Sequence, residues 1–323
     1  MDNFSISRPV NMAPTGIATF AKCPICLDLN DLKADIAIIG APSDIGMQGK
    51  TGTRLGPRGI RMQSTRFHYT EEGSYDPELD TFFLSTKLWS IVDCGDVDYI
   101  PGDLKTTFEN IEAAVRLITR KKAMPVILGG DHSITIPAAR GLDEVGPFNV
   151  VQIDAHLDWT DRIGPQTIFN GSPCRMMASM PYVRHISHLG IHGIGSSRRS
   201  DFLDARAHGD LIYSPRQLRA EGISSVVKNL PHDYPCYVTI DIDSLDYSVA
   251  PGTGSPMTGG LMYDEVREIL EEIARRDEVI GFDLVEVSPP YDEASGITCY
   301  TAARLISDFM GYITKRRELE GRK

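Results

Sequence analysis

The chain has 323 residues, of which 41% are hydrophobic and 24% charged, and its formal net charge at pH 7 is -11. This composition is ordinary for a globular enzyme, and the acidic balance argues against nucleic acid as a partner because the phosphates would be repelled. No apolar run is long enough to span a bilayer, so we expect no membrane interaction. The first 14 residues lack the basic and apolar regions of a signal peptide, which favours a cytoplasmic protein with reduced thiols.

Apolar runs that end in glycine, proline or acidic residues recur along the chain and predict buried strands. Residues 1–33 are polar and contain several prolines, so we expect an arm packed over the body. The predicted strands are 34–41, 88–92, 125–128, 148–154, 186–191, 211–213, 237–242 and 279–287. Helical spacing of apolar residues predicts helices at 103–122, 262–276 and 297–314, and shorter helices open near residues 56 and 134.

The predicted strands are apolar on both faces and alternate with helices. That pattern is typical of a parallel sheet covered by helices. Neither a linker nor a change of composition divides residues 34–323. We therefore predict an N-terminal arm (1–33) and a single α/β domain (34–323) with about eight parallel strands. In such folds the functional site lies beyond the carboxyl ends of the strands.

Three side chains that can bind metal follow the predicted strand at 148–154. Asp154, His156 and Asp158 stand at alternate positions, and alternate residues of an extended chain point to the same side. They could therefore converge on one point just past the end of the strand.

Two further strand ends carry similar side chains. Asp241 and Asp243 follow residues 237–240, and His132 follows the glycines that end the strand at 125–128. Each feature alone is commonplace, since a loop histidine or a capping aspartate would look the same. Together, four carboxylates and two imidazoles would repel one another without cations between them. The pattern predicts two divalent ions, Mn²⁺ or Ni²⁺, that share carboxylates and activate a water molecule.

One more carboxylate, Glu286, closes the predicted strand at 279–287. An acid at this end of the sheet would lie near the metals and could hold a planar cationic group through paired hydrogen bonds. The alternative, an ordinary surface glutamate, fits this position less well.

A Cys-x-x-Cys pair, Cys23 and Cys26, lies in the predicted arm. Redox chemistry or half of a zinc site would be the functional interpretations. Because no second pair accompanies it, we assign it no function.

These segments resemble the ureohydrolases, the family of arginases, agmatinases and guanidino-acid hydrolases. The shared segments are 52–57 (GTRLGP), 129–133 (GGDHS), 154–158 (DAHLD), 241–243 (DID), 251–254 (PGTG) and 286–292 (EVSPPYD). They extend over nearly the whole chain, and residues 16–20 (GIATF) resemble the agmatinase and guanidino-acid branch more than arginase. The resemblance implies a three-layer α/β/α fold and an assembly of three or six subunits.

The resemblance also implies a mechanism. One ion would be held by His132, Asp154, Asp158 and Asp241, and the other by His156, Asp154, Asp241 and Asp243. A hydroxide positioned by Asp158 would attack a small cationic guanidino substrate bound by Glu286, with release of urea and an amine. Mn²⁺ is the usual ion of the family, whereas some of its guanidine and biguanide hydrolases prefer Ni²⁺ and form mixed complexes of two related subunits.

Three positions depart from the family and are expected near the substrate. Asn170 stands where many relatives have a histidine that gives a proton to the leaving amine, and asparagine cannot act as an acid. Trp159 stands where a polar residue is common, and His192 stands where arginine is common. The proton would then come from Asp158, or from a histidine among His185, His188 and His192.

We expect hydrolysis of a C–N bond in a guanidino compound. A bulky, less polar pocket around Trp159 would fit a guanidine that lacks the charged amino-acid group of arginine. Agmatine, a guanidino acid, guanidine itself, an alkylguanidine or a biguanide such as metformin all remain open. The alternatives are a formimino or amide hydrolase on the same fold and a non-catalytic partner subunit, although all six ligand positions are filled.

Overall fold

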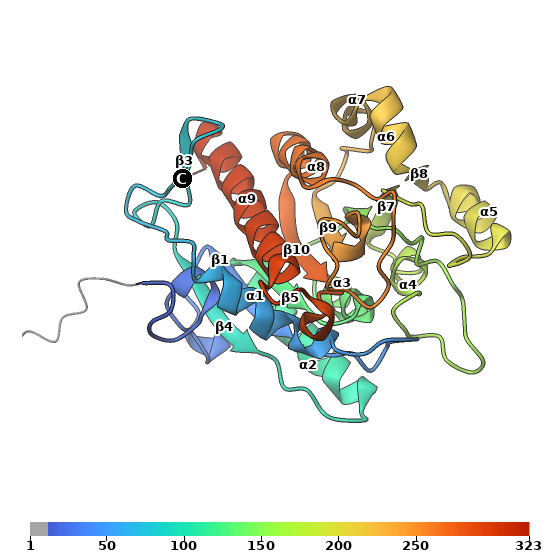
Figure 1. The fold of residues 1–323 in the computed structure, drawn as a ribbon, viewed down its shortest axis with the longest axis horizontal. Helices are drawn as coiled ribbons and strands as arrows, with labels where there is room; N and C mark the ends of the chain where they lie inside the picture. Colours follow the sequence, from blue (N-terminus) through green and yellow to red (C-terminus); the bar gives the residue numbers. More distant parts are fainter. Residues whose placement is uncertain (1–11, 323) are drawn as a thin grey trace, which may run out of the picture.

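The computed structural model describes residues 12–322 and is built on a sheet of eight strands that all run parallel (Figure 1). Across the sheet the order is β4-β1-β5-β10-β9-β6-β7-β8. The strands are β1 (Ile36–Ala41), β4 (Ile91–Asp96), β5 (Met124–Gly129), β6 (Phe148–Ile153), β7 (Val183–Leu189), β8 (Leu211–Tyr213), β9 (Cys236–Asp241) and β10 (Val279–Val285). The signal-peptide argument concerns a segment that lies, up to residue 11, outside the described residues. Within residues 12–322, no helix has the length and apolar character needed to cross a membrane.

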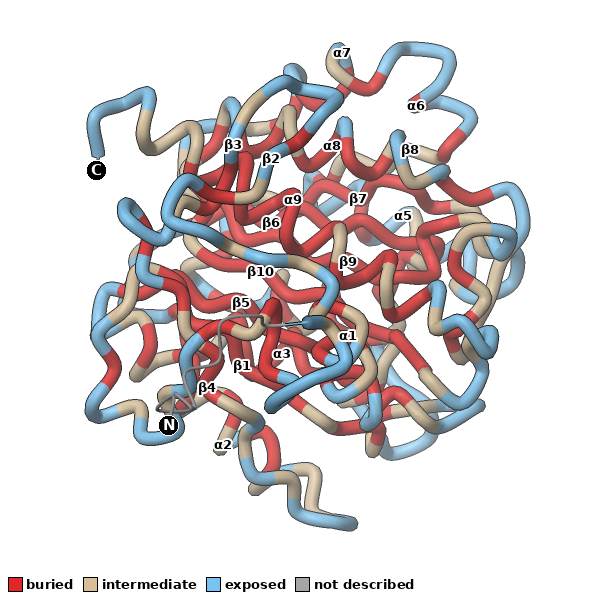
Figure 2. The backbone as a smooth tube through the Cα atoms, turned by 60° about the vertical axis from the view of Figure 1, so that its left-hand side comes forward, coloured by how far each residue is buried: buried red, intermediate tan, exposed pale blue. Residues whose placement is uncertain are grey.

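Alternate side chains of each strand enter different cores, so both faces of the sheet are buried. In β1, Ile36 and Ile38 belong to one core, while Ala37 and Ile39 belong to the other. The first core is covered by α1 (Gly56–Ser64), α7 (Ile223–Lys228), α8 (Tyr263–Arg276) and α9 (Ile297–Leu319), and the second by α2 (Leu104–Arg120), α3 (Thr135–Arg140) and α4 (Pro173–Ala178). The predicted α/β fold, with three layers, is confirmed, and Figure 2 shows the buried strands between the two layers.

The sequence patterns missed several short elements. Four of them follow the central strand: α4, α5 (Arg199–His208), α6 (Pro215–Glu221) and α7. Another is the antiparallel hairpin of β2 (Ser74–Asp76) and β3 (Thr81–Phe83). Helices of six to ten residues complete few turns, so their apolar spacing gives a weak signal.

Several predicted strand boundaries differ from the structure, and two of the differences have a clear physical cause. The strand predicted at 88–92 begins later and continues further, because pairing with β1 resumes beyond a bulge, with Gly40 opposite Asp96. The last strand ends at Val285 rather than at 287, because Glu286 adopts a φ of 64° and turns the chain out of the sheet. That turn is important for the site described below.

The described part of the arm packs against β4 and α1. Phe20 is fully buried, and its backbone N–H donates to the Asp93 carboxylate over 2.6 Å. The same carboxylate accepts from the Arg61 guanidinium, at 2.8 Å from Nε and 3.0 Å from Nη2. Both side chains of this ion pair are more than nine-tenths buried. One carboxylate therefore joins the arm, α1 and β4.

We predict that Asp93→Asn lowers the free energy of unfolding by about 3 kcal/mol, because it leaves a buried guanidinium without its main charge partner. Urea denaturation followed by circular dichroism would measure the change. The control is Glu109→Gln on α2, whose side chain is 61% exposed, and it should stay within about 0.5 kcal/mol of the parent. Equal stability of the two variants would contradict this account of the arm.

Candidate active site and metal centre

Four neighbouring strands deliver the predicted site residues to one edge of the sheet. β5, β10, β9 and β6 are adjacent in that order and end on the same side because they are parallel. His132 follows β5, Glu286 follows β10, Asp241 and Asp243 lie at the end of β9, and Asp154 follows β6. Residues up to 154 positions apart in the chain thus become neighbours.

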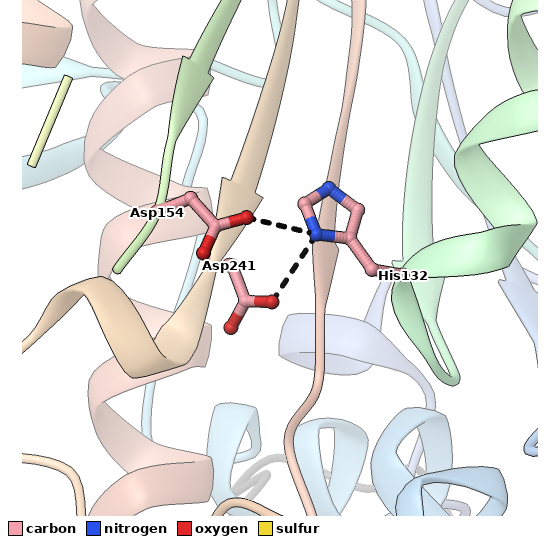
Figure 3. A group of neighbouring side chains, drawn as sticks. All are labelled: His132, Asp154 and Asp241. Atoms are coloured by element: carbon pink, nitrogen blue, oxygen red, sulfur yellow. Dashed lines mark ion pairs between the residues drawn. The ribbon is translucent and has the colours of Figure 1, made fainter. Parts of the chain in front are cut away.

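The first group of side chains surrounds Nδ1 of His132 (Figure 3). Asp154 Oδ2 lies 3.1 Å from this nitrogen, and Asp241 Oδ2 lies 3.2 Å from it. A third carboxylate oxygen, Asp158 Oδ2, lies at 2.9 Å. All four side chains are almost completely buried. Oxygen and nitrogen atoms from three strand ends thus meet at one point.

The second group is built around His156. Its Nδ1 lies 3.0 Å from Asp243 Oδ2 and 3.5 Å from Asp154 Oδ1. Asp154 therefore presents one oxygen to each group. A carboxylate that faces two groups of ligands is what a pair of bridged metal ions requires.

The hydrogen bonds of His132 indicate that its Nδ1 atom is free to bind a metal ion. Asp283 is fully buried and accepts the hydroxyl proton of Thr239 over 2.6 Å. The Thr239 oxygen is then an acceptor for Nε2 of His132, 2.9 Å away, and this bond fixes Nδ1 toward the carboxylates. Nδ1 makes no well-formed hydrogen bond, and a single N–H could reach only one of the three oxygens around it. A metal ion fits this set of atoms better than a proton does.

The electrostatic environment of the two groups also favours the binding of cations. Burial, with the charge of Asp154, raises the pKa of Asp158 to about 6, and burial with the charges of Asp243 and Asp154 raises the pKa of Asp241. Burial acts to lower the pKa of His132, but the surrounding carboxylates outweigh it and raise that pKa well above its ordinary value. The cluster holds more negative charge than a buried site tolerates without divalent ions.

A second buried chain of hydrogen bonds holds Asp154. The Gln152 amide donates from Nε2 to Asp154 Oδ2 over 2.6 Å. Its Oε1 lies 2.5 Å from Nδ1 of His188, whose Nε2 lies 3.0 Å from Asp210 Oδ2. The reverse amide orientation would place Oε1 against the Asp154 carboxylate, so the orientation is fixed from both ends. His188 is fully buried and far from solvent, which suits an orienting residue rather than a proton donor to substrate.

Glu286 lies beside the two groups with one oxygen unused. Its Oε1 accepts the backbone N–H of His132 over 3.0 Å, while Oε2 is buried and has no partner among the described residues. Burial, together with the nearby Asp131, raises the pKa of Glu286 to about 8. A buried acceptor without a hydrogen-bond donor costs free energy, so this oxygen is suited to accept a hydrogen bond from a ligand.

Two site residues hold unusual backbone conformations. Asp158 has a φ of 52° and Glu286 a φ of 64°, in the left-handed region that side chains other than glycine seldom adopt. Such strain is often found at functional sites, where the surrounding structure enforces it. Here it turns each carboxylate toward the cluster.

A cavity of about 250 Å³ opens over the two groups. It is lined by Gln48, Gly49, His156, Asp158, Thr160, Asn170, Gly171, Ser196, Ser197, Asp241, Asp243, Ser255 and Glu286. Asn170 lies where the sequence predicted a substrate contact, with Nδ2 3.4 Å from Glu286 Oε1 and Oδ1 accepting from Gln48 at 3.1 Å. Six predicted site residues thus line one cavity, namely His156, Asp158, Asn170, Asp241, Asp243 and Glu286. His132 and Asp154 are buried and do not line it.

Two predicted substrate residues are not brought to this cavity. Trp159 is buried against the rings of His188 and His208 and donates from Nε1 to Asp204 over 2.7 Å, so its indole faces away. His192 turns Nδ1 to the Gly190 carbonyl oxygen at 2.6 Å and is absent from the lining. The expected bulky, less polar pocket is therefore replaced by a polar one.

The histidines considered as proton donors do not line the cavity either. His188 is engaged by Gln152 and Asp210, and His185 is 44% exposed and lies 3.8 Å from Asp233. Among the lining residues, Asp158 remains as an acid that could serve the leaving group.

Sequence reasoning missed the residues that orient the ligands. Thr239, Asp283 and Gln152 are polar residues inside apolar strands, and this contrast was the available signal. Polar side chains buried in a strand must find hydrogen-bond partners, so their presence one or two residues from a ligand indicates a supporting contact. The loop residues Gln48 and Ser255 carried no such signal.

Comparison with known proteins agrees with this geometry. The family model described as the arginase family matches residues 34–311. The chain is 30% identical over 308 residues to the mitochondrial guanidino acid hydrolase of Homo sapiens, covering 94% of this chain and 84% of that protein. It is 31% identical over 302 residues to the guanidinobutyrase of Pseudomonas aeruginosa, covering 91% of this chain and 92% of that protein.

A solved structure gives the same result. Proclavaminate amidino hydrolase from Streptomyces clavuligerus superposes with a TM-score of 0.80 at 28% identity, over 94% of this chain and 99% of that one. The fold, the family model and the relatives agree over nearly the whole chain. The chain therefore belongs to the arginase family, the ureohydrolases, on its agmatinase-like branch, and is a hydrolase of C–N bonds in linear amidines.

Proposed function

We propose that the protein hydrolyses a guanidino compound to urea and an amine with the help of two divalent metal ions. The observation that supports this most directly is the unpartnered Oε2 of Glu286, which faces the cavity beside both ligand groups. A guanidinium offers paired N–H donors in a plane, the geometry a carboxylate accepts best. The curated relatives named above act on guanidino compounds, which agrees with this assignment.

The two groups of side chains support two ligand sets, and Asp241 is added to the second set from the family resemblance. One ion would be held by His132, Asp154, Asp158 and Asp241, and the other by Asp154, His156, Asp241 and Asp243. Carboxylate with some imidazole suits Mn²⁺ first and Ni²⁺ second. Bound ions would supply Lewis acidity and make a water molecule nucleophilic at neutral pH.

The chain's own residues complete the reaction. Glu286 binds and orients the guanidinium group next to the two ligand groups. Asp158 orients the attacking water and takes its proton, since it lines the cavity and reaches the first group. Asn170 has no proton to give, so its amide positions the substrate and Asp158 passes the proton to the leaving amine.

The wider setting is part of the same proposal. The six cysteines are unpaired, which supports a reducing, cytoplasmic compartment. We expect a trimer or hexamer of identical subunits, and a mixed complex with a related subunit is the alternative. A guanidine, alkylguanidine or biguanide as substrate is the alternative to agmatine or a guanidino acid.

The central test is metal-dependent urea release. Protein stripped with a chelator should be inactive on a panel of guanidino compounds and should recover when Mn²⁺ or Ni²⁺ is added. Asp243→Asn should reduce the metal content from two ions to one. Release of formamide would favour a formimino hydrolase, and a failure to bind either metal would favour a non-catalytic partner subunit.

We predict that Glu286→Gln lowers kcat/KM about 1,000-fold, roughly 4 kcal/mol, because it removes the charge that pairs with the guanidinium. Glutamine can still accept the His132 N–H, so both metal ions should stay bound. Steady-state kinetics and metal analysis check the two statements, with the exposed Glu109→Gln as control. Unchanged kcat/KM would remove Glu286 from substrate binding.

We predict that Gln152→Leu and His188→Leu each weaken metal affinity about 10- to 100-fold. The first removes the hydrogen bond to Asp154, and the second removes the contact that orients the Gln152 amide. Titration calorimetry with Mn²⁺ would measure this. His185→Leu is the matched control, since this half-exposed histidine lies on the same strand, β7, and should bind metal normally. Thermal unfolding of each metal-free variant separates a loss of affinity from a loss of folding.

A further inference from the structure

The lining of the cavity divides into a charged base and a neutral rim. The charged lining residues are His156, Asp158, Asp241, Asp243 and Glu286, and they belong to the ligand groups or to the proposed guanidinium contact. The other eight are Gln48, Gly49, Thr160, Asn170, Gly171, Ser196, Ser197 and Ser255. Every one of these eight is a hydroxyl, an amide or a glycine.

No lysine or arginine occurs among the described residues that line the cavity. Cations that are near in the sequence are engaged or lie elsewhere. Lys50 lies over the ring of Tyr291, 5.3 Å from its centroid, and Arg54 pairs with Asp44 at 2.8 Å. Arg198 and Arg199 follow the rim but are exposed and outside the lining.

A carboxylate tail would therefore find no positively charged partner among the rim residues. Removing such a charge from water without pairing it is strongly unfavourable. A tail with an ammonium group finds no ion pair at the rim, because the lining carboxylates are the buried ones at the base. An alkyl tail gains little, since the rim offers hydroxyls and amides rather than apolar surface to cover it.

Two amides of the rim bound one side of the cavity. Gln48 donates to Asn170 Oδ1 over 3.1 Å, and Asn170 Nδ2 reaches within 3.4 Å of Glu286 Oε1. This pair of amides closes one side of the cavity next to the guanidinium position. About 250 Å³ remains for the whole substrate and its water.

We propose that the substrate is a small guanidine whose tail, where it has one, is uncharged and hydrogen-bonding, such as a hydroxyl or an amide. The proposal rests on the guanidino hydrolysis proposed above and narrows it to this chemical class. It sets this chain apart from its relatives named for guanidino acids and guanidinobutyrate, whose substrates carry a carboxylate.

The test compares guanidine with four substituted guanidines that have short tails of similar length. The tails end in a hydroxyl, a methyl, an ammonium or a carboxylate group, as in (2-hydroxyethyl)guanidine, propylguanidine, (2-aminoethyl)guanidine and 3-guanidinopropionate. With metal-loaded full-length protein, kcat/KM for guanidine or the hydroxyl compound should exceed that for the carboxylate compound about 100-fold. A carboxylate or ammonium compound turned over best would overturn the proposal while leaving guanidino hydrolysis in place.

Binding separates the two proposals further. If none of the compounds is hydrolysed, guanidino hydrolysis fails, and calorimetry on the metal-loaded protein still ranks the ligands. Tighter binding of the neutral-tailed compounds would support the inferred ligand class. Tighter binding of the charged compounds, or no binding of any guanidine, would overturn it.

A variant that adds a cation tests the electrostatic reason. Ser255→Arg places a guanidinium on the rim and should raise kcat/KM for 3-guanidinopropionate about 10-fold relative to guanidine. Ser225→Arg on α7, exposed and outside the cavity lining, makes the same change of charge and should leave the ratio unchanged. An equal response of both variants would show that overall charge, and not the rim, sets the preference.

Discussion

The structure depends on one electrostatic constraint: four carboxylates and two imidazoles share a buried volume at the edge of the sheet. Their mutual repulsion would open the site if nothing positive lay between them. Two chains of buried hydrogen bonds hold the side chains in place. His132 is oriented through Thr239 and Asp283. Asp154 is oriented through Gln152 and His188. The protein therefore holds these side chains in place by its own hydrogen bonds, and bound cations would complete the charge balance.

The order of the strands makes this arrangement possible. β5, β10, β9 and β6 are neighbours in the sheet although β10 is last in the chain, so their carboxyl ends meet at one edge. Apolar side chains on both faces fix each strand in register, and the ligands stand on these ends rather than on long loops. The substrate rim, in contrast, is built from loops that begin near Gln48, Thr160, Ser196 and Ser255. On the proposed function, the strand ends would carry the chemistry and the loops of the rim would set the specificity.

That division explains which parts of the site could be predicted from the sequence. Asp154, His156 and Asp241 could be recognised because strand periodicity gives the direction of each side chain, and a strand end gives its place. Trp159 was assigned to the pocket because relatives carry a polar residue near the substrate at that position. In the structure, Asp158 has a positive φ and the indole of Trp159 packs against His188. The short helices between residues 155 and 235 and the neutral rim were not predictable, since loop conformation decides them and no periodic pattern reports it.

The left-handed backbone at Asp158 and Glu286 has a consequence for how the protein can change. Glycine would adopt these φ values of 52° and 64° without strain, so replacement by glycine favours the local backbone while it deletes a carboxylate from the site. At these two positions the backbone conformation favours glycine, whereas the proposed activity requires a carboxylate. Loss of catalysis would remove the reason to keep a carboxylate at 158 and 286, and glycine would then relieve the local backbone strain at both positions.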